Sequence, residues 1–505
     1  MYARLFESLS PNRSSLDMAK SEEWNFAGRL IQRLGPGSCL IDASSGETLR
    51  GRAITDTIIA FAAGFLSTGM HAGDRVLIGC GLSPGSALAY LGAMYAGLVP
   101  VPVEQRVLPI YGEALLDKTG AKAAWTARDI GLDCTGDRNV VRAQGYFTGS
   151  GACSLKPFPS SETDIAALMP TSGSTGIPRL VMVSHGNLLA NTEAIVRSQK
   201  LGTDERAMLV MPISYVFGAS ILHSHMYQGG AVVFDSRFTF PDKVLRAINA
   251  HACTTFAGVP TAYSMLLRRS NLRSIPLPTL RRFLQAGGAL STQSIQETRQ
   301  IVPSAAFFVM YGQTEATARI SCLPPERLQE KLGSAGVPLD NLTVHIKDDE
   351  GRELPAGQTG EVWVRGPSVC CGYLDDPEET KRKFVDGWLR TDDLGSLDKD
   401  GYLWIKGRKG EFVKMRGLRV SFAEVEAKVA AVSGVCECAA TAVPHREAGE
   451  ALAVFIVPEA GDSGVCERVR RSLPFHWTCE NVRVLAEIPK TSNGKIARSQ
   501  LMSFL

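Results

Sequence analysis

Residues 169–185 read MPTSGSTGIPRLVMVSH, and this stretch decides the fold. At its centre, residues 171–176 are six small residues, four with hydroxyl groups and two glycines, so many backbone N–H groups can face an anion. The apolar runs before and after it (IAALM and LVMV) are typical of strands. A Walker A loop would need Gly-Lys-Ser/Thr opening a helix, which this segment lacks. The pattern therefore predicts a phosphate-binding loop on a β-hairpin, with a flexible surface turn as the alternative.

Composition places this loop in a globular, multi-unit protein. The chain has 505 residues, 45% of them apolar and 21% charged, which suggests roughly two to four domains. A formal charge of +3 gives no field for nucleic acid or an anionic membrane. The apolar run at residues 58–66 is too short to span a bilayer, and the N-terminus shows no secretory signal. Twelve cysteines without C-x-x-C pairs fit a reducing compartment, so we expect a cytoplasmic protein.

Three patterns of predicted secondary structure follow one another along the chain. From about residue 50 to 330, short β-rich runs such as RVLIG (75–79) alternate with helical spacing, which indicates an α/β fold with parallel sheets covered by helices. After residue 333, short strands divided by Gly and Asp turns predict a small antiparallel barrel or sandwich. Beyond residue 408 the pattern predicts a compact α+β unit. We expect an N-terminal core at 1–407, with the β-barrel at about 333–407, and a C-terminal domain at 408–505.

Four further motifs follow the loop: MYGQTEAT (310–317), GWLRTDDLG (387–395), GRKGEFVKMRGLRVSFAEVE (407–426) and PKTSNGKIARSQL (489–501). Alone, each has an ordinary interpretation, such as a surface glutamate, a capped turn, a basic surface helix or a solvated tail. In this order they resemble the adenylate-forming superfamily of acyl-CoA synthetases, peptide-synthetase adenylation domains and firefly luciferase. The resemblance covers roughly residues 50–505. It implies two helix-covered sheets and a β-barrel in the N-terminal domain, followed by a small, mobile C-terminal domain.

The resemblance also implies an ATP site. Thr314 would contact the AMP phosphate, Glu315 would bind Mg²⁺ together with Thr175, and Asp393 and Arg408 would reach the ribose. A carboxylate near phosphate oxygens requires a bridging cation. The full ATP or AMP set is Thr171, Ser172, Gly173, Ser174, Thr175, Gly176, Gly287, Gly288, Ala289, Tyr311, Gly312, Gln313, Asp393, Ile405 and Arg408.

The C-terminal motifs imply a two-step reaction. Lys495 would enter the site from the mobile domain and offset charge as a carboxylate meets the α-phosphate. Gly410 matches the hinge, where glycine eases a backbone rotation. Lys414, Gly417 and Arg419 match residues that reach the site in a second conformation, with Gly417 and Arg419 at the tunnel for the thiol acceptor. Lys495, Glu315, Thr314 and Lys414 are thus the candidate catalytic residues.

Three positions depart from the family pattern. Arg179 stands where lysine is usual, Leu180 where glycine is usual, and Asp392 where glycine precedes the ribose-binding aspartate. Arginine keeps the charge of lysine but not its shape. Whether Asp392 points outward or perturbs the site is open at this stage.

The acyl pocket is predicted from VMPISYVFGASILHSH (210–225) and its neighbours. Tyr215, Val216, Gly258 and Met310 are the candidate wall residues. Val216 falls where amino-acid-activating relatives place an aspartate for the substrate ammonium, and burying an ammonium unpaired is costly. We therefore expect an aliphatic or aromatic acid rather than an α-amino acid.

Taken together, these features predict a ligase that uses ATP and Mg²⁺ to make an acyl-AMP and passes the acyl group to CoA. The alternative acceptor is the phosphopantetheine of a separate carrier protein, because both present the same thiol arm. A non-catalytic nucleotide sensor would lack Glu315, Asp393 or Lys495, and all three are present. Nucleic acid is not an expected partner.

Overall fold

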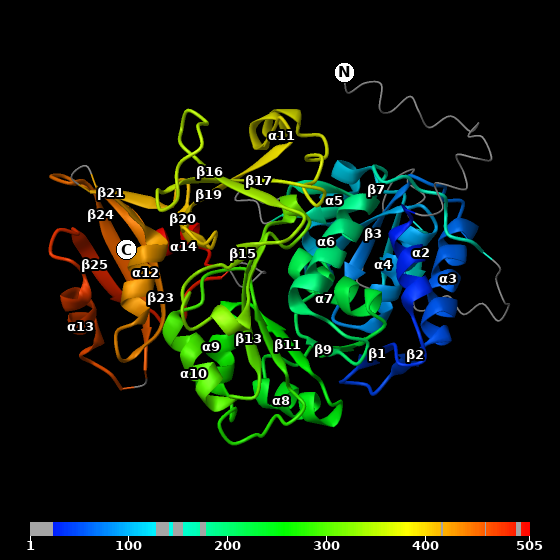
Figure 1. Cartoon of the computed structure of the whole chain (residues 1–505), viewed down its shortest axis with the longest axis horizontal. Helices are drawn as coiled ribbons and strands as arrows, with labels where there is room; N and C mark the ends of the chain where they lie inside the picture. The colour runs from blue at the N-terminus through cyan, green and yellow to red at the C-terminus, as the bar shows by residue number, and fades with distance from the viewer. Residues whose placement is uncertain are drawn as a thin grey trace.

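The computed structural model describes residues 24–127, 141–144, 155–171, 178–415, 418–459, 461–490 and 496–505. Figure 1 shows two helix-covered sheets in the large N-terminal part, an antiparallel sheet above them and a separate C-terminal unit at one side. Within the described part of the chain, no helix combines the length and apolarity needed to cross a membrane.

The first sheet is parallel and has the strand order β4-β3-β5-β6. It confirms the strand predicted at residues 75–79. Alternating with its strands, helices such as α4 bury apolar faces against it, and every residue of α4 is buried. The N-terminal elements are α2 (Phe26–Arg33), α3 (Arg52–Ser67), β3 (Arg75–Cys80), α4 (Pro84–Tyr95), β4 (Val99–Glu104), α5 (Leu108–Thr119), β5 (Ala123–Thr126) and β6 (Val141–Gln144).

The second sheet has nine strands in the order β15-β14-β13-β12-β11-β9-β10-β1-β2. Its six central strands are parallel, and antiparallel strands close both edges. The strands are β1 (Cys39–Asp42), β2 (Thr48–Arg50), β9 (Arg206–Leu209), β10 (Ala231–Phe234), β11 (Thr255–Gly258), β12 (Arg282–Gln285), β13 (Ala306–Tyr311), β14 (Ser321–Leu323) and β15 (Val337–Pro338). The helices between them are α6 (His185–Gln199), α7 (Val216–Tyr227), α8 (Pro241–Ala250), α9 (Pro260–Arg269) and α10 (Thr292–Ile301).

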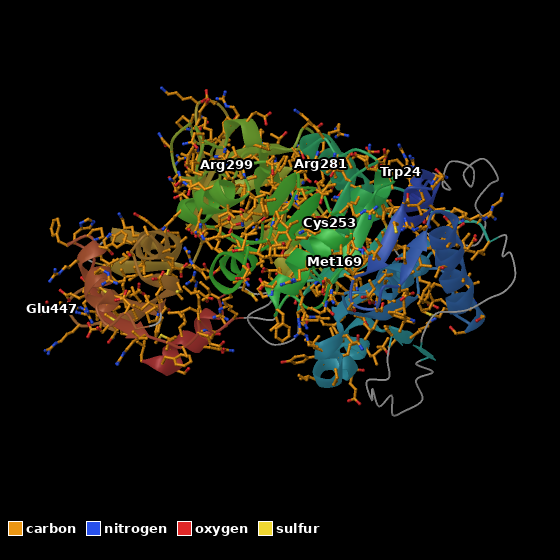
Figure 2. The ribbon with its side chains drawn as sticks, turned by 90° about the horizontal axis from the view of Figure 1, so that it is seen from below. Trp24, Met169, Cys253, Arg281, Arg299 and Glu447 are labelled. Atoms are coloured by element: carbon orange, nitrogen blue, oxygen red, sulfur yellow. The ribbon has the colours of Figure 1, made fainter. Side chains whose placement is uncertain are left out.

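The glycine-rich loop is carried by a hairpin of β7 (Ile165–Pro170) and β8 (Leu180–Ser184), as predicted. The strands pair antiparallel up to Pro170 and Leu180, and the Thr171 N–H donates to the Arg179 carbonyl at 2.8 Å. Met169 on β7 is buried and lies in the middle of the large N-terminal part (Figure 2). The ends of the loop are therefore anchored in the core.

The third sheet is antiparallel and contains β16 (Thr343–Lys347), β17 (Gly360–Arg365), β18 (Phe384–Val385), β19 (Trp388–Leu397) and β20 (Leu403–Arg408). The strands pair as β16-β17-β19, with both β18 and β20 also pairing with β19. The small antiparallel unit predicted after residue 333 is thereby confirmed. A short helix, α11 (Pro377–Lys383), precedes β18 and lies beside β19.

The C-terminal unit has its own sheet, in the order β22-β21-β24-β23 with β25 beside β24, and its own apolar core. It contains β21 (Phe412–Met415), β22 (Leu418–Ser421), α12 (Phe422–Ala430), β23 (Val435–His445), β24 (Gly449–Pro458), α13 (Val465–Ser472), β25 (Cys479–Val484) and α14 (Arg498–Leu501). Figure 2, seen from below, shows this unit, with Glu447 labelled, set apart from the rest. The chain enters it between the end of β20 and the start of β21.

Candidate active site

The segment 310–317 turns sharply at the end of β13. Thr314–Ala316 form a single helical turn, and the Thr317 N–H closes it by donating to the Thr314 carbonyl at 2.9 Å. Gly312 is required by close approach: a Cβ there would lie 1.7 Å from the Ala318 carbonyl oxygen. The chain therefore folds back on itself and presents Gln313, Thr314 and Glu315 at the carboxyl end of a parallel strand, where α/β sheets bind ligands.

Asp393 on β19 meets this turn. The Tyr311 hydroxyl donates to Asp393 Oδ2 at 2.6 Å, and Gln313 Nε2 donates to the same oxygen and to the Thr391 carbonyl. Arg408 lies directly opposite Asp393 in the β19–β20 pairing. Burial raises the pKa of the Asp393 carboxyl above its usual range, while the Arg408 charge and the two donors act in the opposite direction. The structure thus brings together residues from three of the predicted motifs.

Glu315 is held by a residue that sequence reasoning missed. The Tyr373 hydroxyl donates to Glu315 Oε1 at 2.7 Å, and the Cys370 N–H donates to the Glu315 carbonyl at 2.9 Å. Within the described residues, no three His, Cys, Asp or Glu side chains gather as metal ligands. A single oriented carboxylate of this kind fits Mg²⁺, which binds through one or two carboxylates plus substrate phosphates.

Arg179 and Asp392, the two charged residues that depart from the family pattern, both form ion pairs with residues in or beside α11. Arg179 pairs with Asp376 at 3.1 Å and with Glu379 at 3.4 Å, which ties the hairpin to the start of this helix. The Asp392 carboxylate pairs with Arg382 at 2.8 Å and with Lys383 at 3.0 Å. The Asp392 carboxylate is therefore directed toward α11, where it pairs with two cations.

The adenine-side candidates follow β12. Gly287 has φ +86°, a conformation that favours glycine, and Gln285 Nε2 donates to the Gly288 carbonyl at 2.7 Å. Ala289 continues the same exposed turn, and Ile405 lies on β20. Gly258 ends β11 opposite Gln285, so the two turns are neighbours at the carboxyl edge of the sheet.

The acyl-side candidates lie at the start of α7 and on β13. The Tyr215 hydroxyl donates to Glu104 Oε2 at 2.9 Å, and Val216 lines a small cavity. Met310 on β13 accepts a hydrogen bond from Gln199 Nε2. Sequence reasoning missed two residues here: His223, which also lines the cavity, and Arg319, two residues after Thr317 of the MYGQTEAT motif.

On the C-terminal side, Gly410 has φ +92° and open space around it, as a hinge requires. Lys414 is exposed on β21, and its backbone N–H donates to Glu450 Oε2 at 2.6 Å. Several candidates lie outside the described residues: Ser172, Gly173, Ser174, Thr175, Gly176, Gly417, Lys495 and the side chain of Arg419.

Comparison with known proteins decides the family. The model of the AMP-binding enzyme family matches residues 37–374, and that of the AMP-binding enzyme C-terminal domain matches residues 424–495. The chain belongs to the AMP-binding enzyme family. The predicted resemblance and the predicted fold class are both confirmed.

Individual relatives of this AMP-binding enzyme support the same family assignment. A feruloyl-CoA synthase of Amycolatopsis sp is 30% identical over 90% of this chain and 94% of its own length. A 4-coumarate–CoA ligase 5 of Oryza sativa subsp. japonica is 29% identical over 93% and 92%. ATP-bound MatB from Rhodopseudomonas palustris superposes with a TM-score of 0.86 at 25% identity, covering 95% of this chain and 98% of MatB. The AMP-binding enzyme described here is therefore an ATP-binding, AMP-forming acid–thiol ligase of the acyl-CoA synthetase type.

Proposed function

We propose that this enzyme activates a carboxylic acid with MgATP as an acyl-AMP, releases pyrophosphate and transfers the acyl group to the thiol of CoA. The observation that carries the proposal is the Asp393 cluster, in which Tyr311 and Gln313 orient one carboxylate oxygen opposite Arg408. No hydrogen bond from the described residues engages the other oxygen of Asp393, which would accept from the ribose hydroxyls. Glu315 lies two residues after Gln313, so the nucleotide and its phosphates would run along one turn.

Adenylation joins two anionic groups, the substrate carboxylate and the α-phosphate. Catalysis of such a step depends on placement and charge neutralisation more than on proton transfer. Residues 171–176 would cradle the phosphates, and Thr314 would contact the α-phosphate. Glu315 would hold Mg²⁺, which supplies charge neutralisation for the leaving pyrophosphate. Lys495 would bring a further positive charge to the reacting oxygens.

Thioester formation would use the second arrangement of the C-terminal domain. We take residues 1–407 as the adenylation core and 408–505 as the mobile domain. Rotation at Gly410 would remove Lys495 and present Lys414, with Gly417 and Arg419 beside the acceptor arm. The open space around Gly410 and its positive φ support a hinge at this position.

The substrate is proposed to lack an α-ammonium group. No carboxylate lines the small cavity beside Val216 among the described residues. The nearby Glu104 carboxylate is already engaged by Arg106 and by the Tyr215 hydroxyl. An ammonium entering this wall would lose its hydration without gaining an anionic partner.

The acceptor is tested by incubating the enzyme with an activated acid and either CoA or a holo carrier protein. We expect acyl-CoA by liquid chromatography and mass spectrometry, in line with the named CoA ligases among its relatives. A mass gain on the holo carrier without acyl-CoA would assign the carrier protein as acceptor instead. Hydrolysis of the acyl-AMP with neither thioester would contradict both transfers.

A further inference from the structure

Arg319 is a buried arginine for which the described part of the chain provides no anionic partner. Its side chain is 2% exposed, and neither Nε nor Nη2 has a hydrogen-bond acceptor among the described residues. The guanidinium stacks over the Phe217 ring, 5.0 Å from its centroid. Burial lowers its pKa to about 10, which still leaves it charged at neutral pH. A buried charge is normally paired, so this arrangement calls for an anion that the described residues do not supply.

The position of Arg319 connects it to the acyl side of the site. Thr317 and Ala318, immediately before it, line the small cavity, and so does Val216, immediately before Phe217. The Ala318–Arg319 backbone also touches Gly312 in the turn that carries Glu315. Arg319 is not itself a lining residue, but it directly follows the lining residue Ala318, and its guanidinium stacks on Phe217, which directly follows the lining residue Val216.

The backbone of Arg319 is fixed in advance. Asn191 Nδ2 donates to the Arg319 carbonyl at 2.9 Å, and the Arg319 N–H donates to Asn191 Oδ1 at 3.2 Å. Asn191 is itself buried and lines the same cavity. A pre-organised arginine loses little freedom when it binds its partner, which favours a recognition role.

Two other cavity-lining groups have unsatisfied polar atoms. The Tyr90 hydroxyl and His223 Nε2 have no partner among the described residues, and the two rings stack 5.8 Å apart. Burial lowers the pKa of His223 to about 3, so its imidazole is neutral and does not compete with Arg319 for an anion. These groups offer hydrogen bonds to a polar end of the acyl group.

We propose that Arg319 binds a second carboxylate at the far end of the acyl substrate, so that the preferred acid is a dicarboxylate. A planar guanidinium matches a planar carboxylate with two parallel hydrogen bonds. The inference rests on the proposed adenylation of a carboxylic acid and deepens it by naming the substrate class. It assigns Arg319 to specificity, outside the reacting atoms.

The test compares acids of equal length by ATP–pyrophosphate exchange: butanoate with succinate, hexanoate with adipate, and propanoate with 3-sulfopropanoate. The wild type is expected to show a kcat/KM about ten- to hundredfold higher for the best dicarboxylate than for its monocarboxylate partner, the usual range for a charged hydrogen-bonded pair. Preference for the sulfonate over both carboxylates would replace the carboxylate assignment. Equal or better use of monocarboxylates would overturn the inference while leaving adenylation intact, whereas no exchange with any acid would contradict the proposed function itself.

Variants locate the preference. Arg319→Met should abolish the dicarboxylate preference, because it should lower kcat/KM much more for each dicarboxylate than for the monocarboxylate of equal length when an apolar side chain of similar length replaces the charge. Arg319→Lys should retain part of the preference for the dicarboxylate. Arg197→Met, which removes a surface arginine paired with Asp340, is the matched control and should change neither ratio. Dicarboxylate should also raise the melting temperature of the wild type but not of Arg319→Met, a readout independent of turnover. An unchanged preference in Arg319→Met would overturn the assignment.

Discussion

Asp392 occupies a left-handed backbone conformation, φ +60°, at a position where the family usually has glycine. Its carboxylate holds Arg382 and Lys383, and Lys383 is only 3% exposed. Although burial acts to raise its pKa, the hydrogen bonds and charges of these two cations hold it well below its usual range. Asp392 thus has an unfavourable backbone conformation, but its carboxylate stabilises the buried Lys383 cation.

Asp392→Gly tests which effect is larger. Relief of the left-handed backbone is worth about 1 kcal/mol, whereas an unpaired buried lysine costs about 3 kcal/mol or more. We expect a net loss of about 2 kcal/mol in the free energy of unfolding, measured by urea denaturation at pH 7. Because the pKa of Asp392 is depressed, its contribution is present above the unfolded pKa and is lost as the pH falls below about 4, so the gap should narrow there.

The control for this variant is Asp386→Gly. Asp386 also has a positive φ, +49°, but it is exposed and no ion pair joins it to the described residues. It should be as stable as the wild type or slightly more so. Equal stability of Asp392→Gly and Asp386→Gly would show that the α11 ion pairs contribute nothing.

Asp393 has the opposite electrostatic character. Burial raises its pKa, so its charge opposes folding, and the stability linked to this group is lost as the pH rises through the folded-state pKa. Asp393→Asn should therefore keep or raise the melting temperature at pH 7. It should nevertheless raise the KM for ATP at least about tenfold, because the charged acceptor for the ribose is removed. A parallel loss of stability and ATP binding would mean that Asp393 is structural.

Among the elements, sequence periodicity predicts helices and strands correctly where residues that are neighbours along the chain determine the local structure. The parallel strands, the hairpin of the glycine-rich loop and the antiparallel unit after residue 333 all follow from local pattern. Motif order also predicted that Glu315, Asp393 and Arg408 share a site, and the structure brings the Asp393 and Arg408 strands together.

Two of the missed features depend on contacts between distant segments, and the third is a short helix. Tyr373 lies 58 residues from Glu315, and nothing in its own segment indicates the hydrogen bond. Arg319 follows a recognised motif, yet its significance lies in the absence of a partner, which only packing can show. The short helix α11 is seven residues long and too brief for a periodic signal.

Lys414 and Lys495 should act in different steps of the reaction, Lys414 in thioester formation and Lys495 in adenylation. Lys414 is exposed on β21, so Lys414→Ala should fold normally, retain adenylation within about twofold and slow thioester formation at least about tenfold through loss of one charged contact. Lys495→Ala should do the reverse. Burst-phase acyl-AMP formation and acyl-CoA formation, followed separately, distinguish the two. Equal losses in both steps for both variants would contradict the two-conformation reaction.

At the scale of the whole molecule, the site lies where separate units meet. The turn after β13 of the nine-stranded sheet carries Glu315, and the antiparallel sheet carries Asp393 and Arg408. We propose that the C-terminal domain adds Lys414 and Lys495. The C-terminal unit has a separate core and follows the connection between β20 and β21, which contains Gly410. Figure 1 shows this unit at one side of the molecule. Such an arrangement permits one active site to face two domain surfaces in turn.

Acid-dependent adenylation by this enzyme is tested most directly by pyrophosphate release from ATP across a panel of mono- and dicarboxylic acids, with and without CoA. We expect release that depends on the acid and on Mg²⁺, with acyl-AMP accumulating when CoA is omitted and acyl-CoA replacing it when CoA is present. Pyrophosphate release that is independent of any acid, or no release with the entire panel, would contradict acid-dependent adenylation.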